Sequence, residues 1–366
     1  MRHLSKLSIA LLVPLLALAC TKGRTEPMTT AQPSLSPPIV IAHRGASGLR
    51  PEHTLASYEL AIEQGADVIE PDLVPTSDDV LVARHENDIS DTTDVADHPE
   101  FADRRVTRTI DGKKIAGWFT EDFTLAELKT LRAKERVPLL RPGNKAYDGR
   151  FEVPTLAEII ALAKRESAAR GRTIAIYPET KHPSYFAAIG HPIEARLVAQ
   201  LKAAGWDSAE APVFIQSFEV DNLKALHRMT SIRLIQLMDK DGGPADGAVG
   251  SYAEMATPAG LKAVAAYAWG IGPNKAMVMD GRAPTDLVRK AHAVGLRVHP
   301  WTFRAENYFL PSAYRKGINP RGQGDVAGEI RDQLHAGIDG FFTDFPAIGV
   351  KARDAARAAA AARSAE

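Results

Sequence analysis

The sequence predicts a (β/α)8 TIM barrel with an insertion after the second strand, and three observations support this fold class. Apolar runs alternate with helical patterns, which implies a parallel sheet. A helix, a glycine and a strand recur as a unit at Gly65, Gly205, Gly295 and Gly337. Eight apolar runs can be counted, which favours a closed barrel over an open doubly wound sheet. The expected strands begin near Ile39, Val68, Ile174, Val213, Ile232, Tyr267, Val298 and Phe341.

Length and composition fit one large globular domain. The chain has 366 residues, of which 45% are hydrophobic and 25% are charged, and these are ordinary globular values. Its 45 Lys and Arg residues are balanced by 45 Asp and Glu residues, so the net charge does not indicate a basic surface that would bind a polyanion. We therefore expect no nucleic-acid partner.

Residues 1–20 are typical of an export signal. Arg2 and Lys6 precede an apolar run over residues 7–19, which is too short to span a bilayer comfortably. The run ends at Ala19-Cys20, which resembles the bacterial lipobox, and Cys20 is the only cysteine. We expect a periplasmic protein with a lipid anchor at Cys20. Thr21, rather than Asp, follows this cysteine and favours the outer membrane. Simple secretion is the alternative.

The rest of the chain divides by composition. Residues 21–37 are rich in Thr, Ser and Pro and predict a flexible tether. The barrel is expected over residues 38–350, and residues 351–366 form an Ala-rich, helix-prone tail. Residues 86–150 are charged and lack apolar periodicity, so we interpret them as an insertion that emerges beside the site and can cover it.

Helical patterns fill the spaces between the expected strands. Thr54 is a candidate N-cap, because apolar residues recur behind it at helical spacing until Gly65. Within the insertion only residues 124–132 resemble a helix. Residues 239–251 predict a long loop. Further helices are expected over residues 155–170, 194–204 and 285–294.

Polar side chains follow the expected strands at the point where each ends. The first strand ends in His43-Arg44 and the second in Glu70-Pro71-Asp72, whose two carboxylates point to one face of an extended segment. An alternating run over residues 80–84 then leads to His85. Because chemistry in such barrels sits at the carboxyl ends of the strands, these residues predict one site.

Later strands end in polar or aromatic residues as well. The third expected strand ends in Tyr177-Pro178-Glu179, the seventh reaches Trp301, and the eighth ends in Thr343-Asp344. Histidines and carboxylates gathered in this way suit cleavage of a phosphoester, because the carboxylates can bind a hard cation and the imidazoles can move protons.

These motifs together resemble the glycerophosphodiester phosphodiesterase family, and most closely its bacterial periplasmic form. The resemblance covers residues 38–350 and implies a barrel, a divalent metal that is usually calcium in the periplasmic form, and release of sn-glycerol 3-phosphate from deacylated phospholipid headgroups. His53 stands where many members carry Asn. The motifs are His43-Arg44-Gly45-Ala46-Ser47-Gly48, Pro51-Glu52-His53-Thr54, Glu70-Pro71-Asp72-Leu73, His85, Tyr177-Pro178-Glu179-Thr180-Lys181 and Gly340-Phe341-Phe342-Thr343-Asp344-Phe345-Pro346.

Carried over to this chain, the resemblance assigns Glu70, Asp72 and Glu179 as metal ligands. Three carboxylates without a cysteine form an oxygen site, which suits Ca²⁺, or Mg²⁺, rather than zinc. A lone surface Glu is the alternative interpretation for Glu179. A surface position is a weak alternative for Glu70 and Asp72, because burying two carboxylates without a cation costs free energy.

His43 and His85 are expected to be the acid and base of catalysis, and the sequence leaves open which is which. Arg44 is expected to clamp the phosphate, and Lys181 to add a point charge. Trp301 and Phe303 could wall the glycerol pocket or belong to the core. Asp344 either orients a neighbour or caps the last loop.

Two other functions stay open at this point. A phospholipase of type D or C acting on intact lipids would need an exposed apolar rim, and the insertion shows none in its sequence. A lipid-tethered binding protein would keep the barrel without catalysis, but both histidines and all three carboxylates are present. An assay with glycerophosphocholine, with and without a chelator, separates the three functions. The headgroup preference is not predicted.

Overall fold

The structure is a computed structural model that describes residues 38–364. The predicted export signal, the lipid anchor at Cys20 and the tether over residues 21–37 lie outside the described residues. Among the helices of residues 38–364, none is both long and apolar enough to cross a membrane.

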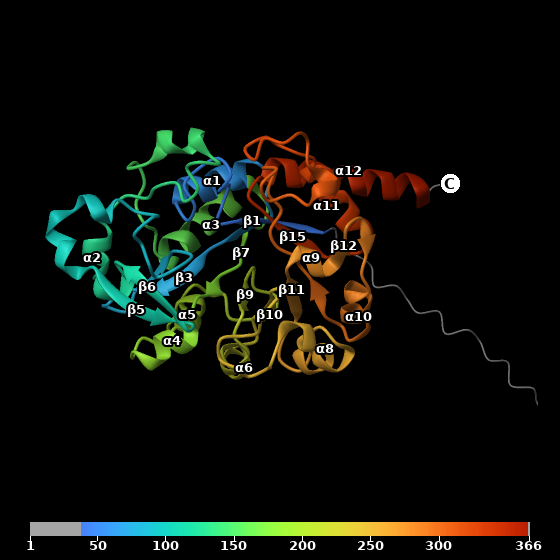
Figure 1. The fold of residues 1–366 in the computed structure, drawn as a ribbon. Coiled ribbons are helices and arrows are strands. Elements are labelled where there is room, and N and C mark those ends of the chain that lie inside the picture. Colours follow the sequence, from blue (N-terminus) through green and yellow to red (C-terminus); the bar gives the residue numbers. More distant parts are fainter. Residues whose placement is uncertain (1–37, 365–366) are drawn as a thin grey trace, which may run out of the picture. The chain divides into compact units, whose positions relative to one another are not determined.

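Eight parallel strand positions close into a barrel, which confirms the predicted fold class (Figure 1). The first strand pairs with the second on one side and with the last on the other. The ring closes beside the seventh strand, where the backbone N–H of Phe342 donates to the carbonyl of Pro300 at 3.0 Å. The eight positions are β1 (Ile39–His43), β2 (Val68–Glu70) with β3 (Asp72–Pro75), β7 (Ala175–Ile176) with β8 (Glu179–Thr180), β9 (Phe214–Ser217), β10 (Arg233–Met238), β11 (Gly270–Pro273), β14 (Arg297–Val298) and β15 (Gly340–Thr343).

Prolines divide the second and third barrel strands. Pro71 separates β2 from β3, and Pro178 lies between β7 and β8. Proline has no backbone N–H, so it interrupts the hydrogen-bond ladder of a strand. Both interruptions fall at the carboxyl end of the barrel, immediately beside Glu70, Asp72 and Glu179.

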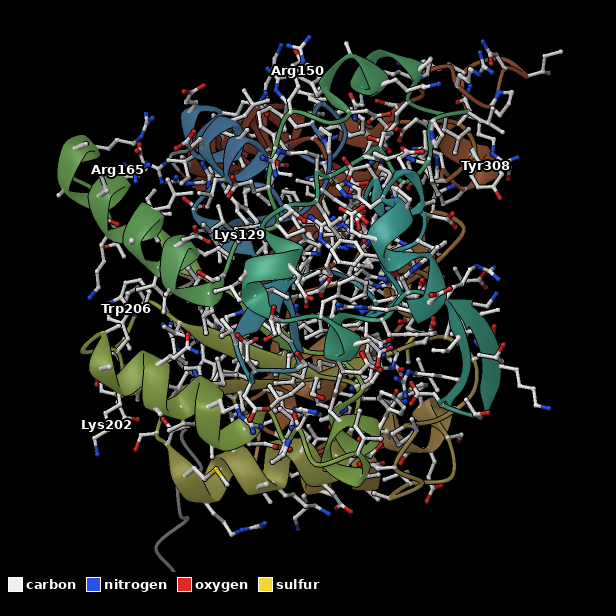
Figure 2. All side chains as sticks on the ribbon, turned by 90° about the vertical axis from the view of Figure 1, so that its left-hand side faces the viewer. Lys129, Arg150, Arg165, Lys202, Trp206 and Tyr308 are labelled. Carbon is white, nitrogen blue, oxygen red and sulfur yellow. The ribbon has the colours of Figure 1, made fainter. Side chains whose placement is uncertain are left out.

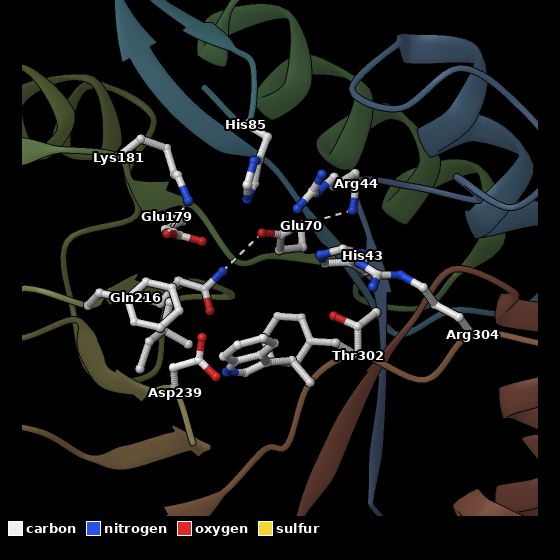
Figure 3. A pocket seen from close by; sticks show the side chains of 14 residues that line it. His43, Arg44, Glu70, His85, Glu179, Lys181, Gln216, Asp239, Thr302 and Arg304 are labelled. Atoms are coloured by element: carbon white, nitrogen blue, oxygen red, sulfur yellow. Dashed lines mark hydrogen bonds and ion pairs between the residues drawn. The ribbon is translucent and has the colours of Figure 1, made fainter. Parts of the chain in front are cut away.

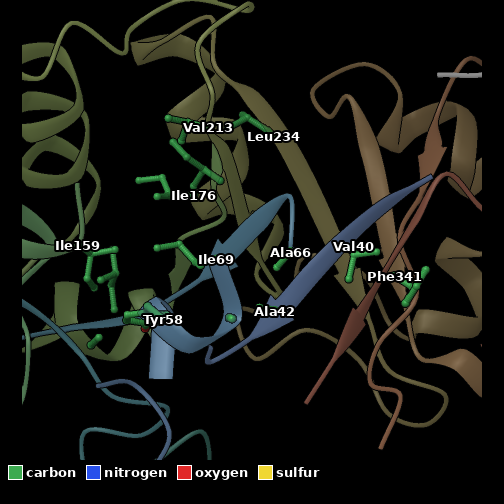
Figure 4. Close-up of a cluster of buried hydrophobic side chains, with 14 of the residues drawn as sticks. Val40, Ala42, Tyr58, Ala66, Ile69, Ile159, Ile176, Val213, Leu234 and Phe341 are labelled. Atoms are coloured by element: carbon green, nitrogen blue, oxygen red, sulfur yellow. The ribbon is translucent and has the colours of Figure 1, made fainter. Parts of the chain in front are cut away.

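The barrel strands are buried on both faces, as parallel strands require. Ile41, Tyr177 and Phe342 belong to a cluster inside the barrel. Val40 and Ala42 alternate with Ile41 and pack instead with the surrounding helices (Figure 4). The core therefore has two layers, and the polar strand ends lie above the inner one.

The predicted helices form with small shifts of their ends. Thr54 caps α1 (Leu55–Glu63), since its side chain accepts from the backbone N–H of Ser57 at 3.1 Å. Thr155 and Glu158 form a capping box at the start of α3 (Leu156–Arg170). The other helices are α4 (Pro183–Ala188), α5 (Glu194–Ala203), α6 (Val220–Met229), α7 (Tyr252–Met255), α8 (Pro258–Val264), α9 (Lys275–Val278), α10 (Leu287–Ala293) and α11 (Val326–His335).

The insertion lies where it was predicted, between the second and third barrel strands. It follows β4 (Leu81–Ala83), which runs antiparallel to β3, and it faces the viewer in Figure 2, where Lys129 and Arg150 are labelled. The predicted helix over residues 124–132 shortens to α2 (Leu125–Leu128). The hairpin of β5 (Val106–Ile110) and β6 (Lys113–Gly117) was not predicted, because most of its side chains are exposed and give no apolar alternation.

The Ala-rich tail is continuous with the barrel. α12 (Pro346–Ser364) begins directly after β15, so the boundary expected at residue 350 lies inside one helix. Ala352 is buried, and Arg353 donates to Asp67 at 2.5 Å. The first turns behind residue 350 therefore belong to the folded barrel. A second small hairpin joins β12 (Met279–Asp280) to β13 (Ala283–Pro284).

Candidate active site

A cavity of about 300 Å³ opens at the carboxyl ends of the barrel strands (Figure 3). The residues predicted for catalysis, substrate binding and metal binding gather here, as the barrel rule requires. Seven of them line the cavity, and Asp72 lies behind them beside Glu70 and Glu179. The seven are His43, Arg44, Glu70, His85, Glu179, Lys181 and Trp301.

The three carboxylates converge as predicted. Each of Glu70, Asp72 and Glu179 offers an oxygen, and these oxygens lie within 4.8 Å of one another. The register explains this arrangement, because Asp72 on β3 is the direct neighbour of Glu179 on β8. All three side chains are buried, with exposed fractions of 1%, 1% and 6%.

Burial and mutual repulsion make this cluster electrostatically unfavourable without a cation. They raise the pKa of Glu70 well above its usual value and raise the pKa of Glu179 to about 8. Burial acts in the same direction on Asp72, but Lys181 and the hydrogen bond from His53 hold the pKa of Asp72 well below its usual range. Its Oδ1 atom has no hydrogen-bond partner among the described residues. An all-oxygen donor set with an unpartnered carboxylate oxygen fits a hard divalent cation.

Each predicted catalytic histidine has its own carboxylate partner. Nδ1 of His43 lies 2.6 Å from Oδ1 of Asp344, so the structure favours the orienting role over the capping role for Asp344. Nδ1 of His85 is hydrogen-bonded to Glu86. A carboxylate at Nδ1 holds the proton there and leaves Nε2 of each ring for the substrate. Both rings point into the cavity in Figure 3.

Burial keeps both imidazoles uncharged at neutral pH. It lowers the pKa of His43 to about 4, with a further contribution from the Arg44 guanidinium, and the Asp344 carboxylate opposes this shift. Burial and Arg44 likewise hold the pKa of His85 well below its usual value. Either ring can thus accept a proton as a base, and the structure leaves their order open.

A left-handed turn places His43 and Arg44 beside the carboxylates. Arg44 has a φ of 60° and Gly45 a φ of 87°. A Cβ atom on Gly45 would lie 2.4 Å from Oγ of Ser57, so only glycine fits there. The turn aims the backbone N–H of Arg44 at Oε2 of Glu70, 2.8 Å away.

The cationic side chains predicted to contact the phosphate line the cavity and are already partly paired. Arg44 donates to Glu52 at 3.1 Å, and its Nε lies 3.3 Å from Oδ2 of Asp72. Nζ of Lys181 donates to Glu179 at 2.8 Å. The two cations therefore flank the carboxylate cluster rather than standing free, and both stay within reach of a ligand in the cavity.

One wall of the cavity is apolar. Trp301 lines it and packs edge-on against Phe218, with ring centroids 5.6 Å apart. The alternative interpretation holds for Phe303, which is fully buried and packs against Phe341 in the outer core. Of the two interpretations of Phe303, the core position is the one that the structure shows, because Phe303 is absent from the lining while its neighbours Trp301 and Thr302 belong to it.

Several residues at the site were not predicted, and His53, Gln216 and Arg304 are three that contact its carboxylates. His53, noted only as a departure from the family pattern, is fully buried and contacts Oδ2 of Asp72 at 2.9 Å. Gln216 donates to Glu70 at 3.0 Å, and its position as a lone amide within an apolar strand was a signal. Arg304 lines the cavity and donates to Asp344 at 3.0 Å. It follows Trp301 in a loop without a spacing motif, so the sequence gave no signal for it.

Comparisons with known proteins identify the family of the chain. Residues 43–348 match the model of the glycerophosphoryl diester phosphodiesterase family. A glycerophosphodiester phosphodiesterase of Arabidopsis thaliana is 38% identical over 328 residues, which cover 85% of this chain and 84% of the relative. One of Haemophilus influenzae is 29% identical over 380 residues, which cover 95% of this chain and 98% of the relative.

Solved structures show the same fold. A glycerophosphoryl diester phosphodiesterase homologue from Silicibacter pomeroyi superposes with a TM-score of 0.62 at 21% identity, covering 87% of this chain and 93% of its own. A phosphodiesterase from Oleispira antarctica, solved with the product sn-glycerol-3-phosphate, has a TM-score of 0.59 at 22% identity. The match covers 87% of this chain and 97% of the Oleispira chain. The family match spans the barrel from His43 at the end of β1 to the first turn of α12, and the chain belongs to the glycerophosphoryl diester phosphodiesterase family.

Proposed function

We propose that this protein hydrolyses glycerophosphodiesters to sn-glycerol 3-phosphate and an alcohol, using a divalent cation and the pair His43 and His85. The observation that carries this proposal is the placement of two carboxylate-bound imidazoles at one cavity with three converging buried carboxylates. The activity itself follows from family membership, and the product named for the Oleispira antarctica structure supports the substrate class.

In this mechanism the two histidines exchange protons with the substrate through Nε2. One imidazole accepts the proton of the attacking group as a new P–O bond forms. If water attacks, sn-glycerol 3-phosphate forms directly; if a neighbouring glycerol hydroxyl attacks, a cyclic phosphate forms first and water then opens it to the same product. The other imidazole takes up a proton from solvent at Nε2 when the anionic phosphodiester binds beside it, and it donates this proton to the leaving alkoxide as the old P–O bond breaks. Asp344 and Glu86 hold the two rings in place, and each stabilises the positive charge that its imidazole carries in the protonated state.

Glu70, Asp72 and Glu179 would hold the cation, and Gln216 and His53 fix the first two of these carboxylates. When bound, the cation supplies positive charge for the phosphoryl oxygens. Arg44 lies at the edge of the cluster and can bind another phosphoryl oxygen through the guanidinium nitrogens that Glu52 does not occupy. We propose Ca²⁺, with Mg²⁺ as the second candidate, because the ligands are carboxylates.

The small diester is favoured over an intact lipid by the polarity of the insertion. Within residues 86–150, all of which the structure describes, only Val106 and Leu139 are large apolar side chains that are substantially exposed. Two separate side chains do not form the apolar rim that docking onto a bilayer needs. A binding protein without catalysis is disfavoured, because both histidines keep carboxylate partners.

The test is release of sn-glycerol 3-phosphate from glycerophosphocholine. We expect turnover that stops when EDTA removes divalent cations and returns with Ca²⁺. Recovery with Mg²⁺ alone would identify the second candidate. Vesicles of intact phosphatidylcholine should give no product. Activity that survives exhaustive chelation, or that appears only with intact lipid, would contradict the proposal.

We also propose export to the periplasm with lipid attachment at Cys20, and the apolar run over residues 7–19 supports this. In a bacterial host that processes lipoproteins, the full chain should fractionate with outer membranes, and Cys20→Ala should release it into the soluble periplasmic fraction. If both the full chain and Cys20→Ala are soluble, the protein is secreted without a lipid anchor.

A further inference from the structure

The insertion contacts the catalytic residues through two arginines that lie five positions apart. Arg136 and Arg141 belong to residues 86–150, and each binds a carboxylate that stands behind a catalytic histidine. We propose that Arg136 and Arg141 are positioning residues that hold both histidines in their working orientation, so that one short segment of the insertion controls both proton-transfer groups. This inference rests on the proposed roles of His43 and His85.

The first connection runs through Glu86 to His85. Arg136 donates to both oxygens of Glu86, at 3.1 and 2.7 Å, while Glu86 binds Nδ1 of His85. The Glu86 side chain is 32% exposed. Among the described residues, its hydrogen bonds are those to His85 and Arg136. Without Arg136, Glu86 is free to rotate into solvent and the ring of His85 loses its fixed position.

The same arginine holds a second carboxylate. Nε and Nη2 of Arg136 donate to Oε1 of Glu52 at 2.8 and 2.7 Å. Glu52 in turn accepts from Arg44, the proposed phosphate ligand, at 3.1 Å. Arg136 therefore joins the partner of His85 to the partner of Arg44, and a planar guanidinium with five donors is suited to bridge two carboxylates.

The second connection runs through Asp344 to His43. Nη2 of Arg141 donates to Oδ2 of Asp344 at 2.5 Å, and Oδ1 of the same carboxylate binds Nδ1 of His43. Nε of Arg141 donates to Glu306 at 2.6 Å. All of these side chains are less than 12% exposed. Arg304 makes another contact with Oδ2 of Asp344 at 3.0 Å, so this connection has a second support that the Glu86 connection lacks.

The segment between the two arginines is fixed to the barrel. The backbone N–H groups of Leu140 and Arg141 both donate to the carbonyl of Val137 at 2.9 Å, which closes a tight turn. Nη1 of Arg141 donates at 2.9 Å to the carbonyl of Ser47, in the loop that follows His43. Because the turn sets the spacing of the arginines, both histidines depend on the same piece of backbone.

The experiment compares Arg136→Met, Arg136→Lys, Arg141→Met and Arg141→Lys in the full-length protein. Neither arginine lines the cavity, and we expect kcat on glycerophosphocholine to fall about 10- to 100-fold in the methionine variants. KM should be nearly unchanged in Arg141→Met and should rise in Arg136→Met, because Arg136 also holds Glu52, the partner of Arg44. The lysine variants should recover part of the loss, since they keep a charge but not the forked geometry. Arg136→Met should be the more severe, because Arg304 still holds Asp344 in Arg141→Met.

Arg104→Met is the matched control, because Arg104 also lies in the insertion and pairs with Glu127, away from both histidines. It should leave kcat and the pH profile unchanged. The pH dependence of kcat should move in the Met variants, since a guanidinium is lost from the carboxylate behind each imidazole.

A readout without substrate separates this inference from the proposed function. In ¹⁵N NMR spectra of the imidazoles, the Nδ1–H form of His85 should lose its uniform signal in Arg136→Met while that of His43 is retained. If the unmodified protein cleaves no phosphodiester but Arg136→Met still loses the His85 signal, the proposed function is wrong and the positioning role stands. Unchanged spectra and kcat in folded Arg136→Met and Arg141→Met would overturn the inference. If a methionine variant does not fold, its lysine variant takes its place. Unchanged spectra, full activity and an unaltered pH profile in that lysine variant would also overturn the inference.

Discussion

At the scale of single residues, catalysis should depend on the two imidazoles and hardly on other histidines. His43→Ala and His85→Ala should each lower turnover about 100- to 10,000-fold, because each removes one general acid or base. His98→Ala is the control, since the side chain of His98 pairs with Asp94 and Glu100 and stacks on the ring of Phe101 near the surface. Turnover of glycerophosphocholine and the melting temperature are the measurements. Near-normal turnover in either variant would refute the assignment.

The carboxylate cluster should make the fold sensitive to divalent cations. A ligand that binds only the native state stabilises it, by about 2.7 kcal/mol at 100 times its Kd. In a domain of this size we expect the melting temperature of chelated protein to rise by about 4 °C when Ca²⁺ is added.

Glu70→Gln and Asp72→Asn should remove this cation response while the protein stays folded. Glu329→Gln should keep the response, because Glu329 is buried beside Lys275 and not beside other carboxylates. Scanning calorimetry of the four proteins in EDTA and in Ca²⁺ decides the matter. An equal rise in all of them would place the binding site elsewhere.

At the scale of elements, the turn after β1 is the most constrained connection at the site. Gly45→Ala would place a methyl group against Ser57 at a positive φ, so we expect a loss of more than about 1 kcal/mol of unfolding free energy. Activity should fall as well, because the same turn carries His43 and Arg44. Gly143→Ala is the control, since its φ is not positive and a Cβ there has nothing within 4 Å.

Urea unfolding and turnover together test this prediction. A Gly45→Ala protein as stable as the Gly143→Ala protein would show that the turn can relax, and the strain argument would be wrong.

The elements that the sequence predicted well are those whose pattern reports burial. Apolar runs such as residues 213–218 and the cap Thr54 marked real strands and helices, because burial and capping act locally. The hairpin of β5 and β6 gave no such signal, since its strands expose most side chains on both faces. The start of α12 at Pro346 was also missed, because the Ala-rich composition that indicated a helix begins only later in the chain.

The site was predicted to the extent that its residues sit at strand ends. Glu70, Asp72 and Glu179 could be grouped because the barrel rule brings strand ends together. Arg136 and Arg141 could not, because their position depends on how an irregular insertion folds back over the barrel. Their partners, Glu86 and Asp344, are 50 and 203 positions away in the sequence. No local pattern encodes such pairings.

At the scale of the whole molecule, one buried histidine should contribute to acid sensitivity. His299 lies inside the barrel, 1% exposed, with Nδ1 3.0 Å from the hydroxyl of Tyr177. Burial lowers the pKa of His299 from 6.5 to about 4. The unfolded chain therefore binds this proton first, so the contribution of His299 to stability is complete above about pH 6.5 and is lost as the pH falls towards 4.

His299→Gln should remove this part of the pH dependence. We expect the difference in unfolding free energy between the unmodified protein and His299→Gln to shrink by about 3 kcal/mol from pH 7 to pH 4. Urea unfolding of both proteins at several pH values measures this difference. A constant difference for His299→Gln would show that the imidazole binds its proton equally well in the folded and the unfolded chain, and the prediction would be wrong.

The hairpin of β3 and β4 has a consequence for which length changes this chain can tolerate. His85 follows a strand that pairs antiparallel with β3, with Ala83 opposite Leu73 and Leu81 opposite Pro75. Because successive side chains of a strand alternate between its faces, one extra residue in the connecting turn at Ser77-Asp78-Asp79 would shift the pairing by one and send the imidazole to the opposite face. Single-residue insertions there should abolish turnover although no reactive group is altered. A two-residue insertion can return the His85 side chain to its original face of the strand.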